Sequence, residues 1–312
     1  MSNDCAGWRN SPAQDGRGVS PPELITQVKA WACELPTKLG APLSRWSIVE
    51  LTRRLCESEL CVPVSPSTVW RWLHQDAIRP WLHRCWIFPR DPDFATKAGR
   101  ILDLYERRWQ GRRLQADEFV ISADEKTSIQ ARARIHPTLA PAPGQAMKVE
   151  HEYERRGAVA YIAAWDVHRA HVFGRCEDTT GIAAFDRLVD QVMSQSPYRE
   201  ARRVFWIVDN GSSHRGQRSI ERLRSHHPNL QLVHGPVHAS WLNQIEIYFS
   251  IIQRKVLTPN DYPSTDAIAS ALHRFERHYE SRAQPFKWKF TRRDLRRLLH
   301  KLSGGTYLAT TT

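Results

Sequence analysis

Three acidic residues have the types and the spacing of a metal-dependent catalytic centre. Asp124 follows the strand-like segment 118–123, and Asp209 follows the apolar segment 204–208. Glu246 comes after a further 36 residues, in a predicted helix. Converging carboxylates repel one another, and Mg²⁺, which prefers hard oxygen ligands, removes that repulsion. Two such ions can activate a water or hydroxyl group and stabilise the leaving oxygen of a phosphodiester. The pattern therefore indicates nuclease or strand-transfer chemistry.

Each of these acids also has an ordinary structural explanation. Asp124 could cap a turn, and Asp209-Asn210-Gly211 is a good turn sequence in its own right. Glu246 could pair with Arg254 or another cation. Two aspartates at predicted strand ends nonetheless favour chemistry, because ligands of open α/β sheets collect at the carboxyl ends of strands.

The elements around the three acids predict a mixed α/β sheet with helices on both faces. Predicted strands cover residues 118–123, 157–164, 170–176, 204–208 and 230–233, and predicted helices cover 180–194, 215–225, 241–256 and 264–280. The continuous apolar run 204–208 is expected of a strand that is buried on both faces. In the helix 241–256, the spacing places Glu246 on the apolar face, beside Leu242 and Phe249.

The N-terminal region has the pattern of a helix-turn-helix. A helix that begins at Ser20-Pro21 is followed by an amphipathic helix over 44–56, whose apolar positions include Trp46, Val49, Leu51 and Leu55. Ser65-Pro66 then begins a further helix, because Ser is a good N-cap and Pro a good first residue. In this motif the second helix lies in the major groove. We therefore expect Ser67, Thr68 and Arg71 to contact bases, although an ordinary helical hairpin has the same pattern.

The composition favours a nucleic-acid partner. Lys and Arg number 45 against 33 Asp and Glu, a net charge of +12 that is spread along the chain. Such an excess promotes association with polyanions. No apolar run approaches the roughly 18 residues that span a membrane, and the N-terminus lacks the apolar core of a signal peptide. We therefore expect no membrane partner and a cytoplasmic location.

The cysteines do not indicate a metal site. Six are scattered without a C-x-x-C pair, which is typical of reduced thiols in a cytoplasmic protein. Cys56, Cys61, His74 and His83 weakly resemble a zinc-finger set, but the final spacing is too long for it. A structural zinc ion is disfavoured.

Three segments resemble the motif blocks of mariner-related bacterial insertion-sequence transposases, of the insertion-sequence-630 branch. They are ADEKTSIQ at 123–130, IVDNGSSH at 207–214 and HASWLNQIE at 238–246. The resemblance covers roughly residues 21–300. It implies a ribonuclease-H-like catalytic domain in which Asp124, Asp209 and Glu246 hold Mg²⁺, with Mn²⁺ as a substitute and two ions in the site. It further implies positions near the phosphate or the ligands for four residues: Lys126, Asn210, His214 and Asn243.

The resemblance also implies a reaction and its partners. The enzyme would cut double-stranded DNA at terminal inverted repeats and join the ends to target DNA, at TA sites, as a homodimer on DNA in a bacterial, nucleoid-associated location. Family members usually carry two helix-turn-helix units, whereas segment 20–72 has room for one and resembles the second. Two alternatives therefore stay open: a DNA-binding regulator or decayed copy without catalysis, and a ribonuclease-H-like nuclease that does not transpose.

These patterns predict five regions. They are a disordered lead over 1–20, a helix-turn-helix domain over 21–95, a linker helix over 96–117, the catalytic domain over 118–300 and a tail over 301–312.

Overall fold

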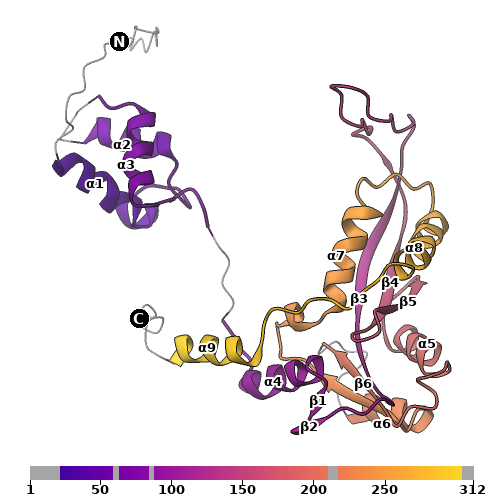
Figure 1. Ribbon diagram of the computed structural model, residues 1–312. Coiled ribbons are helices and arrows are strands. Elements are labelled where there is room, and N and C mark those ends of the chain that lie inside the picture. The colour runs from indigo at the N-terminus through magenta and orange to yellow at the C-terminus, as the bar shows by residue number, and fades with distance from the viewer. Residues whose placement is uncertain (1–21, 59–62, 84–87, 210–216, 304–312) are drawn as a thin grey trace. The chain divides into compact units, whose positions relative to one another are not determined.

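The computed structural model describes residues 22–58, 63–83, 88–209 and 217–303, which fall into two units, Met1–Ile87 and Phe88–Thr312 (Figure 1). The boundary differs from the expected one, because residues 88–95 belong to the second unit. The linker helix expected over 96–117 is also shorter: α4 spans Phe94–Tyr105, and its apolar side packs within the second unit. Each unit is described by itself.

The first unit is helical. Its elements are α1 (Pro22–Ala32), η1 (Pro36–Leu39), α2 (Ile48–Glu57) and α3 (Pro66–Gln75). Each of the three α-helices packs against the other two. The core they enclose is built from Leu24, Val28, Ala32, Trp46, Leu51, Leu55, Val69, Trp72 and Leu73.

The ends of α2 and α3 follow from their capping residues. The Ser47 side chain accepts a hydrogen bond from the backbone N–H of Glu50, and the Ser65 side chain accepts one from that of Thr68. Each bond satisfies a donor that the first turn of a helix leaves unpaired. The helix expected over 44–56 therefore begins at Ile48. Val49 lies on the outward side of this helix, where it is 56% exposed instead of joining the core.

The second unit contains a five-stranded sheet flanked by helices. Its strands are β3 (Glu118–Ala133), β4 (Glu154–Asp166), β5 (His171–Glu177), β6 (Arg203–Val208) and β7 (Leu230–His234), and a separate two-stranded hairpin pairs β1 (Arg108–Trp109) with β2 (Arg112–Arg113). The remaining elements are α5 (Ile182–Met193), α6 (Gln217–His226), η2 (Ser240–Leu242), α7 (Ile245–Lys255), α8 (Thr265–Glu280) and α9 (Arg292–Ser303).

The sheet has the order β5-β4-β3-β6-β7. β3, β6 and β7 run parallel, whereas β4 pairs antiparallel with both β3 and β5. The predicted mixed sheet is thus confirmed.

Both faces of the sheet are covered. One apolar cluster joins the sheet to α4, α7 and α8, and a second joins the opposite face to α5 and α6. β6 contributes to both clusters, with Trp206 on one side and Phe205 and Ile207 on the other. This confirms the expectation of a strand buried on both faces. Within the described ranges, no helix is long and apolar enough to cross a membrane.

Two elements near the acids differ from the prediction. β3 does not end before Asp124 but continues to Ala133, and the following segment 134–153 extends past the helices (Figure 1). The β3–β4 pairing shifts register between Lys126 and Ile129, where Ser128 adopts a φ of 57°. The helix expected over 241–256 begins only at Ile245, because η2 precedes it. Leu242 is therefore not a helical neighbour of Glu246.

Burial in the first unit predicts contrasting effects of two substitutions. Leu73 is fully buried, so Leu73→Ala should lower the free energy of unfolding by about 2–5 kcal/mol. Val49→Ala, at the exposed position, should change it by less than about 0.5 kcal/mol. Amide hydrogen exchange of α1, α2 and α3 in the full chain measures both. Equal losses would contradict the position of Val49 outside the core.

Candidate active site

Asp124 and Asp209 lie at the same level on neighbouring strands. The last parallel pair of β3 and β6 is Ser122 with Ile207. Because both strands run in the same direction, two further residues along each bring the chain to Asp124 and to Asp209. Neighbouring strands are about 4.8 Å apart. The two carboxylates therefore occupy adjacent positions at one end of the buried parallel pairing, although Asp124 is inside its strand and not at its end.

Glu246 lies in the first turn of α7. Its side chain is half-buried. Burial raises the pKa of Glu246, the positive charge of Lys126 opposes that shift, and the negative charge of Asp209 adds to it. Glu246 is thus close enough to Asp209 and Lys126 for their charges to act on it. The structure brings these three side chains to one place.

A buried hydroxyl ties α7 to the strand that carries Asp124. Ser122 donates a hydrogen bond to the side-chain oxygen of Asn243 and accepts one from the backbone N–H of Ile245, at 2.9 Å. Asn243 in turn donates to the backbone oxygen of Ala123, at 2.9 Å, and lies 3.4 Å from a carboxylate oxygen of Asp124. The N-cap residue of α7 has no capping bond from its own side chain. Ser122 supplies that bond from β3, and this sets the position of the first turn.

Tyr105, at the end of α4, holds the same turn from the other side. Its hydroxyl donates to the backbone oxygen of Leu242, at 2.7 Å, and accepts from the backbone N–H of Gln244, at 3.2 Å. Burial raises the pKa of Tyr105, which keeps the hydroxyl protonated and able to donate. Three elements, α4, β3 and α7, are therefore joined by hydrogen bonds directly beneath Glu246.

Sequence reasoning identified Asn243 but not Ser122 or Tyr105. A signal for Ser122 was present, since it is the one hydroxyl in the strand segment 118–123 and is fully buried in the structure. Buried hydroxyls require partners. No comparable signal marked Tyr105, whose partners are about 140 positions away along the chain. Asn210 and His214 lie outside the described residues.

The donor set suits a hard divalent cation. It consists of carboxylates, and the pKa of Glu246 is raised by burial and, to a smaller extent, by the negative charge of Asp209, both of which a bound cation would offset. In the described part of the chain, no three His, Cys, Asp or Glu side chains are close enough to hold a metal ion as they stand. A site built from Asp124, Asp209 and Glu246 therefore requires side-chain movement when an ion binds.

In the first unit, α3 presents a polar face. Ser67 and Arg71 are exposed, while Thr68 is half-buried and accepts a hydrogen bond from Arg71, at 3.1 Å. Sequence reasoning missed Trp70, which is 45% exposed and stacks on His74 with 4.6 Å between ring centroids. The exposed face of α3 thus combines a cation with an aromatic surface.

The zinc alternative gains no support from the described residues. His74 is stacked on Trp70, the ring of His83 lies 3.4 Å from the Arg45 guanidinium, and Cys56 is an exposed free cysteine. Cys61 lies outside the described residues.

Comparison with known proteins gives one family match. Residues 120–269 match the family described as DDE superfamily endonuclease, and that span includes Asp124, Asp209 and Glu246. No curated protein sequence matches the chain.

Solved structures of Mos1 have a similar fold. The mariner Mos1 paired-end complex with Mn is 16% identical, with a TM-score of 0.53, over 94% of this chain and 83% of that one. The pre-cleavage Mos1 transpososome is 15% identical, with a TM-score of 0.53, over 91% and 79%. The Mos1 strand transfer complex is 12% identical, with a TM-score of 0.51, over 92% and 79%.

The mixed sheet and its flanking helices therefore form a ribonuclease-H-like fold, like that of the Mos1 catalytic domain. Within this fold, residues 120–269 of the second unit are similar to the DDE superfamily endonuclease family.

Removal of the Ser122 hydroxyl tests the hydrogen bonds beneath Glu246. Ser122→Ala leaves the buried N–H of Ile245 without this acceptor, which should cost about 1–3 kcal/mol of stability. Ser225→Ala is the matched control, because the exposed Ser225 hydroxyl bonds only within its own helix end, to the backbone oxygen of Arg222 and the ring of His226. Amide exchange of β3 and β6 measures the difference. If both variants are equally stable, Ser122 does not hold α7.

Proposed function

We propose that the chain is a DNA transposase that cuts DNA at the ends of a mobile element and joins those ends to target DNA. One observation carries the proposal: Asp209 and Lys126 act electrostatically on Glu246 at the end of the parallel β3–β6 pairing, level with Asp124, within the range that matches the DDE superfamily endonuclease family. The similar structures are of Mos1 in paired-end and strand transfer complexes. The finer assignment, to the mariner-related bacterial insertion-sequence branch, rests on the three motif blocks.

In this proposal, Asp124, Asp209 and Glu246 hold two Mg²⁺ ions, which Mn²⁺ can replace. Mos1 complexes were solved with Mn and with Mg. When bound, such ions lower the pKa of water and neutralise charge that develops on phosphate oxygens. The tie of Asn243 to β3 keeps the first turn of α7, and with it Glu246, directed at the two aspartates.

The proposed chemistry is two in-line phosphoryl transfers at one site. In the first, water attacks phosphorus, the bond to the 3′ oxygen breaks, and the products are a 3′-hydroxyl and a 5′-phosphate. In the second, that 3′-hydroxyl attacks a phosphodiester of target DNA, at a TA site, and releases a new 3′-hydroxyl. Lys126 lies beside Glu246 and would hold the reacting phosphate by its charge. Asn210 and His214 are proposed to support this site.

The first unit is proposed to recognise the terminal inverted repeats. Ser67 and Arg71 project from the N-terminal half of α3, where a recognition helix contacts base edges. Arg can form two hydrogen bonds to guanine, and Thr68 can meet a thymine methyl group. Because two ends must be joined to one target, we propose that the protein acts as a homodimer on DNA.

Conservative substitutions of the carboxylates test the catalytic assignment. The protein is incubated with labelled terminal-repeat DNA and Mg²⁺ or Mn²⁺. Asp124→Asn, Asp209→Asn and Glu246→Gln should each lower the cleavage rate at least about a hundred-fold, since each removes a charged metal ligand. Asp178→Asn, at an exposed acid, is the matched control and should cleave as the unmodified protein does.

Each other outcome identifies an alternative. Metal-dependent cleavage without joining to target DNA would indicate a nuclease that does not transpose. Specific binding of the repeats without any cleavage would indicate a regulator without catalysis. Cleavage that persists in Asp209→Asn would refute the assignment of the three carboxylates.

Arg71→Ala tests the recognition helix. Loss of one two-bond contact to guanine should reduce the preference for terminal-repeat DNA over unrelated DNA by about 1–3 kcal/mol. Competition binding at fixed salt gives that ratio. Lys38→Ala, at an exposed cation of the same unit, should leave the ratio unchanged. An unchanged ratio in Arg71→Ala would mean that α3 does not read sequence through this residue.

A further inference from the structure

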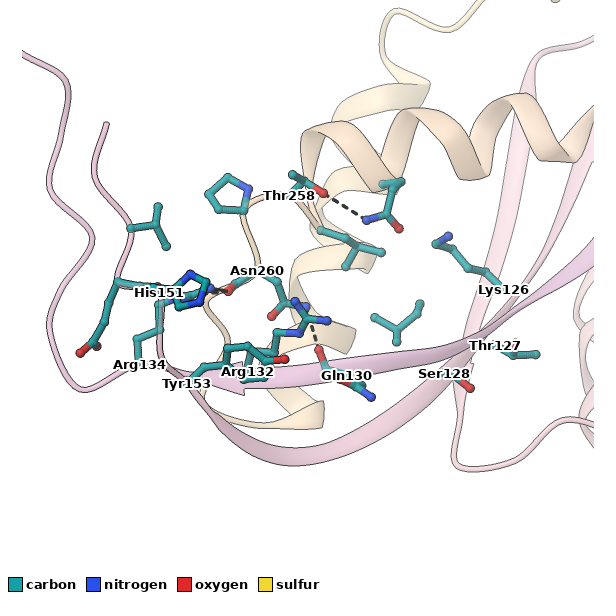
Figure 2. Close-up of a pocket in the computed structure, with 16 residues that line it drawn as sticks. Lys126, Thr127, Ser128, Gln130, Arg132, Arg134, His151, Tyr153, Thr258 and Asn260 are labelled. Carbon is teal, nitrogen blue, oxygen red and sulfur yellow. Dashed lines mark hydrogen bonds between the residues drawn. The ribbon is translucent and has the colours of Figure 1, made fainter. Parts of the chain in front are cut away.

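A groove of about 630 Å³ runs along β3 from Lys126 toward the segment 134–153 (Figure 2). Lys126 lies at one end, and Arg134 and His151 lie at the other. Its opposite wall is formed by the end of α7 and the residues after it, including Asn260. Lys126 links this end of the groove to the candidate active site, because its charge also acts on Glu246.

The lining of the groove is positively charged. It contains Lys126, Arg132 and Arg134 against a single carboxylate, Glu150, among the described lining residues. That carboxylate is already engaged, because it accepts hydrogen bonds from the backbone N–H groups of Ile135 and His136 and contacts the His136 ring at 2.8 Å. The remaining positive charge of the groove favours the binding of an anion.

The fold does not pair every polar atom of Arg132. Its Nε atom is buried without a hydrogen-bond partner in the described part of the chain, as is the side-chain oxygen of Asn260 on the opposite wall. Unpaired buried polar atoms are rare and costly in folded proteins. Small rotations of these side chains would offer a ligand one cationic donor and one acceptor across the groove.

An aromatic ring completes the lining. The guanidinium carbon of Arg132 lies 4.7 Å from the centre of the Tyr153 ring, and that of Arg134 lies 5.7 Å from it. Arg134 is held in place because it donates to the backbone oxygen atoms of Glu152 and Asn260. Tyr153 itself is 36% exposed. A basic groove with an aromatic ring is the combination that binds single-stranded nucleic acid, through phosphates and through stacked bases.

We propose that this groove holds an unpaired DNA strand that continues from the phosphate at the carboxylates. The inference rests on the proposed function, which makes DNA the substrate. The volume of the groove lies within the range of roughly 300–1,000 Å³ found for pockets that enclose small ligands. That is room for a short piece of one strand. Arg132 would contact its backbone, and Tyr153 would stack on a base.

Binding without catalysis tests the groove. Fluorescence anisotropy in EDTA compares the full chain on two labelled DNAs of the same sequence, a blunt duplex and one with a short unpaired extension. Arg132→Gln and Tyr153→Ala should each bind the extended DNA about ten-fold more weakly and the blunt duplex as before. For Arg132→Gln, the slope of log affinity against log salt should fall by about 0.7, the value for one phosphate contact on a single strand. Arg199→Gln, at an exposed arginine paired with Glu200, is the charge-matched control.

The outcomes are distinct. Unchanged binding of the extended DNA by both variants overturns the proposal, and an equal loss on both DNAs overturns the choice of an unpaired strand. If Arg132→Gln alone fails to fold, as judged by circular dichroism, Tyr153→Ala decides, because it leaves every charge in place. If the groove variants bind the extended DNA more weakly but the unmodified protein never cleaves DNA with Mg²⁺ or Mn²⁺, the groove proposal stands and the proposed function is refuted.

Discussion

The active-site end of the sheet depends on one hydroxyl buried inside a strand. Ser122 is fully enclosed, and it is stable there because it donates to Asn243 and accepts from the backbone of Ile245. A buried polar group without partners would be unfavourable, so the same bonds that satisfy Ser122 also determine where α7 begins. The start of α7 determines where Glu246 lies relative to Asp209. The position of Glu246 thus follows from hydrogen bonds made by Ser122, a residue with no proposed part in the reaction.

Periodicity predicted the parts of the fold that burial alone determines. The run 204–208 became β6, buried on both faces, and Ser65-Pro66 began α3 as its capping chemistry requires. The full length of β3 could not be predicted in this way. Beyond Lys126 it pairs only with β4, and its register shifts twice, so neither alternation nor a continuous apolar run marks it. Long-range pairing, and not local propensity, makes this outer part a strand.

The acids of the candidate site were proposed from the sequence, but the hydrogen bonds that position the elements carrying them were not. Asp124 and Asp209 stood out because each follows a strand-like segment, and the observed register places them level with each other. The reasoning about Glu246 was partly wrong, since Leu242 belongs to η2 and not to a helix continuous with Glu246. Sequence spacing could not reveal the break, because it is imposed by contacts with Tyr105 and Ser122 that lie far away along the chain.

The two halves of β3 pair with different strands, and this difference suits the roles proposed for them. The first half lies between β4 and β6 in the buried centre of the sheet, which gives the carboxylates a rigid base. A register shift follows Lys126, and such irregularities are common beside active sites. The second half, with Arg132, pairs with β4 alone and forms the floor of the groove. One continuous strand therefore carries Asp124 and lines the groove, so a nucleic-acid strand bound along it would enter the active site in a defined register.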